Sequence, residues 1–254
     1  MGRIIAIANQ KGGVGKTTTA VNLAACLAVA EKPTLLIDMD PQANATSGCG
    51  VQAVEAEQGN VYHALLGHKT AASIVRPTEI GHLYLIPSHI NLTGAEVEMV
   101  SMIAREQKLE GILEEIASGY EYIVVDCPPS LGLLTVNALT AADSVLIPIQ
   151  CEYYALEGLG KLLNTIRLIQ RHLNPKLQIA GVLLTMYDGR LNLSRQVAAE
   201  VKSYFGSKVF RTAITRNVRL AEAPSFGQPI VLYDILSPGA QNYMSLAGEV
   251  IGHG

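Results

Sequence analysis

The sequence predicts an α/β fold, a doubly wound and mostly parallel sheet with helices on both faces, and three observations support this prediction. Short apolar runs of strand type alternate along the chain with longer helix-forming stretches. That alternation is typical of a parallel sheet whose strands are buried on both faces. The composition, 49% hydrophobic and 16% charged in 254 residues, is sufficient for one large core. Finally, the first apolar run leads directly into a glycine-rich turn that precedes a helix-forming stretch.

The predicted elements follow one another without a clear break. Strands are expected over residues 4–8, 35–40, 83–87, 122–126, 144–149 and 179–185, with a short one over 208–210. Helices are expected over residues 20–30, 61–67, 71–75, 131–142, 153–172, about 192–202 and 238–251, with a broken helix over 92–116. The sequence contains no linker, internal repeat or low-complexity tract that would divide it. We therefore expect residues 1–254 to form a single domain.

The glycine-rich turn spans residues 9–19 and reads Asn-Gln-Lys-Gly-Gly-Val-Gly-Lys-Thr-Thr-Thr. Such a turn points successive backbone N–H groups into one concavity, where the positive end of the helix dipole attracts an anion. In the usual P-loop, Gly-x-x-x-x-Gly-Lys-Ser/Thr, the lysine contacts the β- and γ-phosphates and the following hydroxyl holds Mg²⁺. Lys16 and Thr17 occupy those positions. We therefore predict that this turn binds a nucleotide phosphate, rather than being a solvated glycine turn.

Two of the predicted strands end in carboxylates. Asp38 and Asp40 close the second strand, where the alternation of side chains puts both on one side. Asp126 closes the fourth strand in the Walker B arrangement, which holds Mg²⁺ through water in P-loop enzymes. Aspartates can also be ordinary strand ends or helix caps, but open α/β sheets bind their ligands at the carboxyl ends of the strands. The polar residues 41–48 that follow are expected to form a mobile switch segment.

The charge of the chain is unevenly distributed. Residues 161–219 hold eleven Lys and Arg against two acidic residues, a net charge of +9, so the remainder carries −12 within an overall −3. This distribution favours a face that binds a polyanion, although a solvated basic surface without a partner explains the charge equally well.

The sequence argues against zinc binding, export and membrane insertion. The four cysteines are scattered and form no Cys-x-x-Cys pair, so we expect reduced thiols. The N-terminus lacks a signal-peptide pattern, and no apolar run reaches the roughly 18 residues of a membrane span. The last predicted helix region offers only Glu249 and His253 as ionisable groups, whereas a membrane-targeting helix favours basic residues on its polar face. We expect a cytoplasmic protein that does not bind membranes.

Together these motifs resemble the deviant Walker A ATPases of the ParA/MinD group. Gln10 replaces the first glycine of the usual P-loop and is followed by an additional lysine, Lys11. Over residues 3–252 the sequence is most similar to the ParA/Soj family of chromosome-partitioning ATPases, and the similarity rests on segments 11–17, 38–42, 126–130, 151–158 and 216–225. Ala43 departs from the pattern, because related proteins usually have glycine there.

The resemblance implies ATP and Mg²⁺ as cofactors and an ATP-dependent homodimer. It also implies that the dimer binds double-stranded DNA non-specifically, and that the N-terminal peptide of a ParB-type partner stimulates hydrolysis. The triphosphate would be held by Lys11, Gly12, Gly13, Val14, Gly15, Lys16, Thr17 and Thr18.

Further roles follow from matching positions in that family. The Mg²⁺ shell would comprise Thr17, Asp38 and Asp126. Lys16 and Lys11 would be catalytic, with Lys11 reaching the partner subunit's nucleotide like an arginine finger, and Asp40 would orient the attacking water.

The resemblance also assigns the surface that binds DNA. The matching positions are Arg190 and Arg219, with Arg216 and Lys202 as further candidates. Such a protein would associate with the nucleoid.

The adenine of the nucleotide is expected near Thr185, Met186 and residues 212–224.

Two other functions are compatible with the same loop. A nucleotide-dependent metal-cluster carrier or reductase would need paired cysteines at a dimer axis, and Cys127 has no evident mate. A small-molecule kinase or ligase would transfer phosphate rather than release it.

Overall fold

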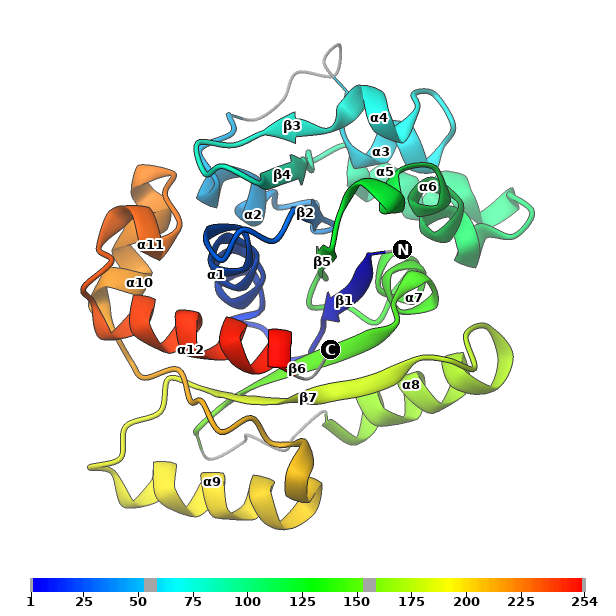
Figure 1. Ribbon diagram of the computed structural model, residues 1–254. Helices are drawn as coiled ribbons and strands as arrows, with labels where there is room; N and C mark the ends of the chain where they lie inside the picture. Colours follow the sequence, from blue (N-terminus) through cyan, green and yellow to red (C-terminus); the bar gives the residue numbers. More distant parts are fainter. Residues whose placement is uncertain (1, 53–58, 153–158, 253–254) are drawn as a thin grey trace.

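The computed structural model describes residues 2–52, 59–152 and 159–252 and contains a seven-stranded sheet (Figure 1). The strands are β1 (Arg3–Ile7), β2 (Thr34–Asp38), β3 (Arg76–Pro77), β4 (Leu83–Ile86), β5 (Tyr122–Asp126), β6 (Ser144–Gln150) and β7 (Gln178–Thr185). They lie in the order β3-β4-β2-β5-β1-β6-β7, and each neighbouring pair is parallel except β3 with β4. The predicted doubly wound, mostly parallel sheet is therefore confirmed.

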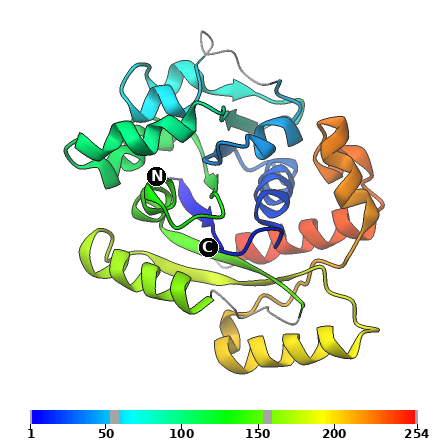
Figure 2. The same ribbon diagram turned by 180° about the vertical axis from the view of Figure 1, so that it is seen from behind.

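Helices cover both faces of this sheet (Figures 1 and 2). The α-helices are α1 (Lys16–Val29), α2 (Asn44–Gly48), α3 (Val61–Leu65), α4 (Ala71–Ile74), α5 (Leu92–Glu98), α6 (Lys108–Ile116), α7 (Leu133–Ala141), α8 (Leu159–His172), α9 (Asn192–Phe205), α10 (Val218–Glu222), α11 (Ile230–Tyr233) and α12 (Pro238–Gly252). Short 3₁₀ turns are η2 (Met99–Ser101), η3 (Arg105–Gln107), η4 (Ala117–Gly119), η5 (Gly206–Lys208) and η6 (Ala223–Phe226). None of the described helices is both long and apolar enough to cross a membrane.

The central strand β1 shows why its sequence is apolar throughout. Ile5 and Ile7 pack into the core beside α1 and α12, whereas Ile4 and Ala6 pack into the core beside α7 and α8. Successive side chains of a strand point to opposite faces, so a strand covered on both sides needs apolar residues at every position. The carboxyl ends of β1, β2 and β5, where the predicted site residues lie, are thereby fixed from both sides.

Helix α1 begins four residues before the predicted start at residue 20. Gly15 adopts a left-handed backbone (φ 86°) and serves as its N-cap, so the helix begins at Lys16. The threonines at 17–19 form its first turn even though threonine has a modest helix propensity. The glycine-rich loop thus runs directly into a helix N-terminus.

Several sequence expectations are corrected by the structure. Residues 41–48 are not simply an irregular segment, because Asn44–Gly48 form α2. Residues 208–210 form no strand of their own; Val209 makes a single bridge to Val182 after η5. Strand β3 and helices α10 and α11 were not predicted, since elements of two to five residues are too short to show a periodicity. Of the helix expected over 153–172, residues 153–158 lie outside the described residues.

Candidate functional site

The glycine-rich loop lies at the carboxyl end of β1, between that strand and α1. Gly13 and Gly15 have φ angles of 73° and 86°, which only glycine adopts without strain. A Cβ atom placed at Gly12 or Gly13 would meet no atom within 4 Å. The loop therefore has open space beside it, and the first N–H groups of α1 have no intrahelical acceptor. This is the geometry of an anion site at a helix N-terminus.

Two buried polar side chains anchor the loop to the sheet. The Asn9 amide donates to the carbonyl oxygen of Pro148 (2.7 Å) and accepts the backbone N–H of Lys11 (3.0 Å). The Thr185 hydroxyl donates to the carbonyl oxygen of Val14 (2.8 Å). The loop is thus held from β6 and from the end of β7. Asn9 was not predicted to have this role, for which the one available signal was a polar residue directly after an apolar strand.

Lys16 is the buried cation of the site, with 7% of its surface exposed. Its Nζ donates to the carbonyl oxygen of Lys11 at 3.0 Å. Burial lowers the pKa of Lys16, while the charges of Asp126 and Asp40 oppose this shift. A buried cation surrounded by carboxylates gains from an additional anionic ligand such as a phosphate.

Asp38 and Asp126 lie side by side as register partners at the ends of β2 and β5. Asp38 is fully buried and accepts three hydrogen bonds, from the N–H of Asp40 (3.0 Å) and from the N–H and hydroxyl of Thr46 (2.8 and 2.7 Å). Burial raises the pKa of Asp38 to about 6, and the bonds from Thr46 limit the rise. A carboxylate has about four acceptor positions, so Asp38 retains capacity for roughly one more donor.

Asp126 has a different environment from its neighbour. It is fully buried, yet neither of its carboxylate oxygens accepts a hydrogen bond within the described residues. Burial and then repulsion by Asp38 raise the pKa of Asp126 well above its usual value, while the Thr17 hydroxyl and Lys16 act in the opposite direction. An unpartnered buried carboxylate beside a second carboxylate and a threonine hydroxyl fits Mg²⁺, which takes oxygen ligands from one or two carboxylates and from substrate phosphates.

The phosphate loop and Asp40 line one cavity of about 560 Å³. Its lining also includes Pro41, Asn44, Pro128 and Ser130, so the segments after β1, β2 and β5 converge there. The Asp40 carboxylate is nearly buried (7% exposed) and accepts the N–H of Gln42 at 3.0 Å. Gly12, Gly13, Gly15, Lys16, Thr17 and Thr18 of the predicted set thus lie around the same cavity as Asp40, whereas Lys11 and the buried Val14 do not line it.

A second cavity of about 200 Å³ adjoins the first, because Gly15, Thr18 and Met186 line both. It lies where the base of a nucleotide was expected, and its lining comprises Gly15, Thr18, Thr185, Met186, Ile214, Thr215, Arg216, Asn217, Leu220, Ala221 and Tyr243. The sequence assigned Tyr243 only to core packing. Its hydroxyl also lies 3.2 Å from that of Thr19 in α1, so helix α12 contributes to the wall of this cavity.

Three of the four predicted DNA-contacting residues lie on adjacent segments. Tyr187 bridges to Thr215, which brings the loop of Arg190 beside the segment of Arg216 and Arg219. Lys202 is exposed but lies in the last turn of α9, about ten residues along that helix, or roughly 15 Å, from its start. The structure therefore separates Lys202 from the three arginines.

Each of these three arginines has an acidic partner within the chain. Arg190 makes two hydrogen bonds to Asp188 (2.9 and 2.7 Å), and Arg216 contacts Glu152 at 3.2 Å.

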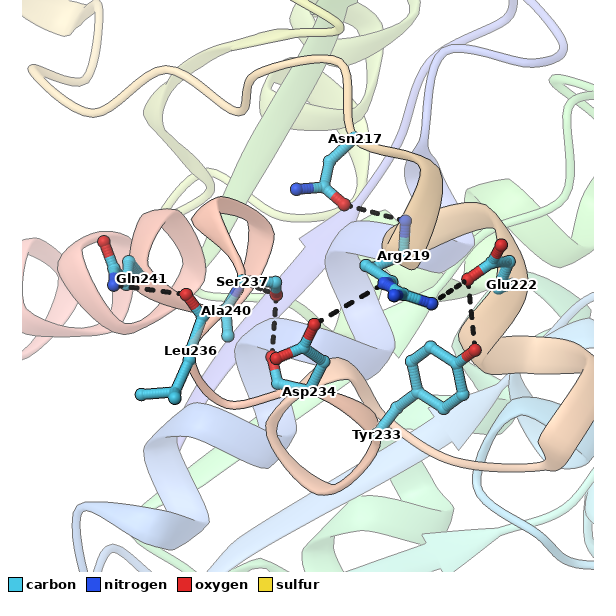
Figure 3. Close-up of polar contacts among 9 residues, drawn as sticks. All are labelled: Asn217, Arg219, Glu222, Tyr233, Asp234, Leu236, Ser237, Ala240 and Gln241. Carbon is cyan, nitrogen blue, oxygen red and sulfur yellow. Dashed lines mark hydrogen bonds and ion pairs between the residues drawn. The ribbon is translucent and has the colours of Figure 1, made fainter.

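Arg219 lies between two carboxylates from different elements (Figure 3). Its Nη1 donates to Glu222 at 2.9 Å, and its Nε lies 3.6 Å from Asp234. The hydroxyl of Tyr233 donates to the same Glu222 oxygen at 3.1 Å. Asp234 was not foreseen as a partner, because it follows α11 and is brought to Arg219 only by the fold.

All four cysteines are free and buried, in agreement with the expected reduced thiols. Cys127 follows Asp126 and is 1% exposed. The cysteines are therefore not presented at the surface of the described structure, where a cluster shared between two subunits would need them.

Comparisons with known proteins agree with this geometry. A family model described as an AAA domain matches residues 2–179. The chain is 59% identical over 254 residues to the sporulation initiation inhibitor protein Soj of Bacillus subtilis, covering 100% of both chains. It is 56% identical over 251 residues to the chromosome partitioning protein ParA of Myxococcus xanthus, covering 99% of this chain and 88% of that protein.

Among solved structures, the fold is similar to that of cobyrinic acid a,c-diamide synthase from Mycobacterium smegmatis with a bound ATP analogue and magnesium. The TM-score is 0.88 at 35% sequence identity, covering 100% of this chain and 96% of that one.

Proposed function

Because the chain belongs to the Soj and ParA family of chromosome-partitioning ATPases, we propose that it is an ATP-controlled DNA-partitioning switch. ATP binding joins two copies into a dimer, the dimer binds double-stranded DNA without sequence preference, and hydrolysis releases it. Association with DNA places the protein on the nucleoid.

The observation that carries this proposal is the pair of adjoining cavities around the N-terminus of α1. One is lined by the phosphate loop and Asp40, and the other by Thr185, Met186 and the segment before α10. Their shared residues, Gly15, Thr18 and Met186, form a continuous path suited to a nucleotide whose phosphates lie on the loop and whose base lies beside β7. The solved relative with an ATP analogue and magnesium supports the same type of ligand.

Positioning and charge neutralisation supply most of the catalysis in phosphoryl transfer. Lys16 and the N–H groups of Thr17 and Thr18 hold the phosphates, and Asp40 orients the attacking water. Asp126, Thr17 and the remaining acceptor position of Asp38 would hold Mg²⁺, which would neutralise charge on the phosphate oxygens.

Lys11 completes the site of a second copy. It is half-buried at the edge of the loop, and its backbone is fixed by Asn9. Its ammonium group supplies positive charge to the partner's nucleotide, so a single copy hydrolyses ATP slowly. A ParB-type partner peptide accelerates hydrolysis.

Arg190, Arg216 and Arg219 bind phosphates of the DNA backbone. They are exposed and lie on neighbouring segments. Contacts with the backbone rather than with bases give binding without sequence preference. Lys202 contributes from the far end of α9.

The two rival functions are less well supported. A metal-cluster carrier would need accessible cysteines, and all four are buried. The solved relative is named as a synthase and is 35% identical, whereas the partitioning relatives are 59% and 56% identical over nearly the whole chain.

DNA co-sedimentation with ATP, with ADP and without nucleotide tests the proposal. We expect DNA to be bound with ATP but not with ADP or without nucleotide. In a separate assay, release of inorganic phosphate should rise when DNA and a ParB-type peptide are added. Equal DNA binding under all three conditions would refute the switch. Transfer of the phosphate to a small molecule would support the kinase instead, and phosphate release that depends on a small-molecule substrate rather than on DNA would support the ligase.

A further inference from the structure

Thr46 lies at a buried junction of three segments and has no part in the function described above. It is the third residue of α2 and 1% exposed. Its N–H and its hydroxyl both donate to the same Asp38 oxygen, Oδ2, at 2.8 and 2.7 Å. The hydroxyl oxygen also accepts the N–H of Ser88, at the end of β4, at 2.9 Å. Thr46 therefore connects β2, α2 and the segment after β4.

The contact with Asp38 substitutes for a missing helix cap. Helix α2 has no side-chain cap of its own, because its N-cap position is Ala43. A capping side chain normally accepts the N–H of the second or third residue of the helix. Asp38 does this for Thr46 from the neighbouring strand, so the position of α2 depends on the orientation of this carboxylate.

The other oxygen of the same carboxylate holds the proposed water-orienting residue. Asp38 Oδ1 accepts the N–H of Asp40 at 3.0 Å. Rotation of the Asp38 carboxylate would disturb its bonds to Thr46 and its bond to Asp40 at once. The Thr46 hydroxyl opposes that rotation, because it holds Oδ2 while being held itself by Ser88. One carboxylate thus joins the Thr46 hydroxyl to the backbone of Asp40.

We propose that Thr46 is a positioning residue for ATP hydrolysis: its hydroxyl fixes Asp38, and Asp38 fixes the backbone of Asp40. This inference rests on the proposed hydrolytic function. Thr46 touches neither nucleotide nor water; it sets the place from which Asp40 acts. Residues 41–48 are accordingly a switch segment whose position is fixed by the hydrogen bonds of Thr46.

Three variants test this role. Thr46→Val keeps the shape and removes the hydroxyl, and Thr46→Ser keeps the hydroxyl and removes the methyl group. Thr140→Val is the matched control, since Thr140 is a buried threonine (2% exposed) whose hydroxyl has no hydrogen-bond partner in the described structure. Thr46→Ala, which also lacks the hydroxyl, is used if Thr46→Val does not fold.

Two measurements are made on each variant. In ATP hydrolysis with DNA and partner peptide, we expect Thr46→Val to lower kcat about tenfold and to change KM by less than about twofold, because nucleotide binding is retained and positioning is lost. Thr46→Ser and Thr140→Val should stay close to wild type. In amide hydrogen exchange without nucleotide, Thr46→Val should exchange faster over residues 38–48 and not across the remaining sheet.

The possible results separate this inference from the proposed function. Any one of three results would overturn the positioning role. Thr46→Val could keep the wild-type kcat, Thr46→Ser could lose as much kcat as Thr46→Val, or amide exchange over residues 38–48 could be unchanged in Thr46→Val. Failure of both hydroxyl-free variants to fold would overturn it as well, since the hydroxyl would then be purely structural. If the wild-type protein releases no phosphate at all, the hydrolytic function itself is refuted.

Discussion

The ammonium group of Lys16 lies 3.0 Å from the backbone carbonyl oxygen of Lys11, so the two lysines of the phosphate loop are directly linked. Bound phosphates would compete for the same ammonium group, because a charged acceptor forms the stronger hydrogen bond. Nucleotide binding would thereby be connected to the backbone of Lys11, the residue proposed to act on a second copy.

Replacing Lys11 with alanine should give a protein that binds ATP but stays monomeric. The contact with Lys16 uses the backbone of Lys11, so it survives the substitution, and ATP affinity should change by less than about threefold, or roughly 0.7 kcal/mol. Size-exclusion chromatography with a non-hydrolysable ATP analogue measures the outcome. Lys176→Ala, an exposed lysine before β7, is the control and should dimerise normally. A normal dimer of Lys11→Ala would contradict the role of Lys11 across the interface.

Replacing Asp40 with alanine should stop hydrolysis while ATP binding and dimerisation continue. The carboxylate lines the same cavity as the phosphate loop but accepts its hydrogen bond from the N–H of Gln42, outside that loop. Loss of a group that orients the attacking water or accepts its proton typically lowers the reaction rate 10²- to 10⁴-fold, so we expect a fall in kcat of at least about 100-fold. A phosphate-release assay measures this, with Glu114→Ala on the exposed face of α6 as control. Turnover at the wild-type rate would remove Asp40 from the mechanism.

The central part of the site was predictable because its signals are local in the sequence. The phosphate loop is contiguous, and its order of strand, glycines, lysine and hydroxyls directly predicts an anion site. Asp38 and Asp126 are distant in sequence, but both follow apolar strands. The carboxyl ends of parallel strands meet at one edge of the sheet, and the observed register does pair these two residues.

Several supporting contacts were not predictable, because they join side chains that only the fold brings together. The Asp38 carboxylate on β2 caps α2 by accepting the N–H of Thr46, and Asp234 reaches Arg219 from beyond α11. The charge count over residues 161–219 indicated a basic region but assigned no acidic partner to Arg190, Arg216 or Arg219. Asp188 and Glu222 lie only two and three residues from their arginines, so sequence spacing could have suggested them, whereas Glu152 is brought to Arg216 by the fold. Hydrogen bonds of this kind leave no periodic pattern in the sequence.

The raised pKa of Asp38 predicts that stability changes between about pH 4 and pH 6. Burial raises this pKa from 3.8 to about 6, so the folded protein binds the proton more tightly than the unfolded chain. The resulting stabilisation is complete below the unfolded pKa and is lost as pH rises through about 6.

Urea unfolding at several pH values measures this effect. In the wild-type protein Asp38 should contribute a slope of up to about 1.4 kcal/mol per pH unit in that window. Asp38→Asn should reduce the slope by this contribution, while Asp126, whose pKa is also raised by burial, still contributes its own. Asp188→Asn is the control. Arg190 lowers the pKa of Asp188 to about 2, so stabilisation by Asp188 is lost only in more acidic solution. An unchanged slope in Asp38→Asn would contradict the assignment.

Replacing Ala43 with glycine should stabilise the protein. Ala43 has φ 53°, in the left-handed region, immediately before α2. That conformation costs an L-residue roughly 1–2 kcal/mol, whereas glycine loses an additional 0.5–1 kcal/mol or so of backbone entropy. We therefore expect a gain of at most about 1.5 kcal/mol in the free energy of unfolding. Ala45→Gly, inside α2, is the control and should destabilise by roughly 0.5–1 kcal/mol. Loss of stability in Ala43→Gly would show that the left-handed backbone is not strained.

The acidic partners of Arg219 lead to a pair of opposite predictions for DNA binding. Arg219→Ala should weaken binding to all DNA sequences alike and reduce the salt dependence by about 0.9 in log–log slope, as for one lost phosphate contact. Glu222→Gln should strengthen binding, because Glu222 occupies a donor of Arg219 that a phosphate would otherwise take. Exposed ion pairs contribute at most about 1 kcal/mol, so the gain should not exceed roughly fivefold.

Fluorescence anisotropy over a salt series, with ATP present, measures both effects. Arg171→Ala, at the exposed end of α8, is the control for simple loss of positive charge and should change binding little. The sign of the Glu222→Gln effect is decisive. Stronger binding means that Glu222 competes with DNA for Arg219, whereas weaker binding would mean that Glu222 and Asp234 hold the guanidinium in its binding orientation. A loss in Arg219→Ala on one DNA sequence only would show that this arginine reads bases rather than the backbone.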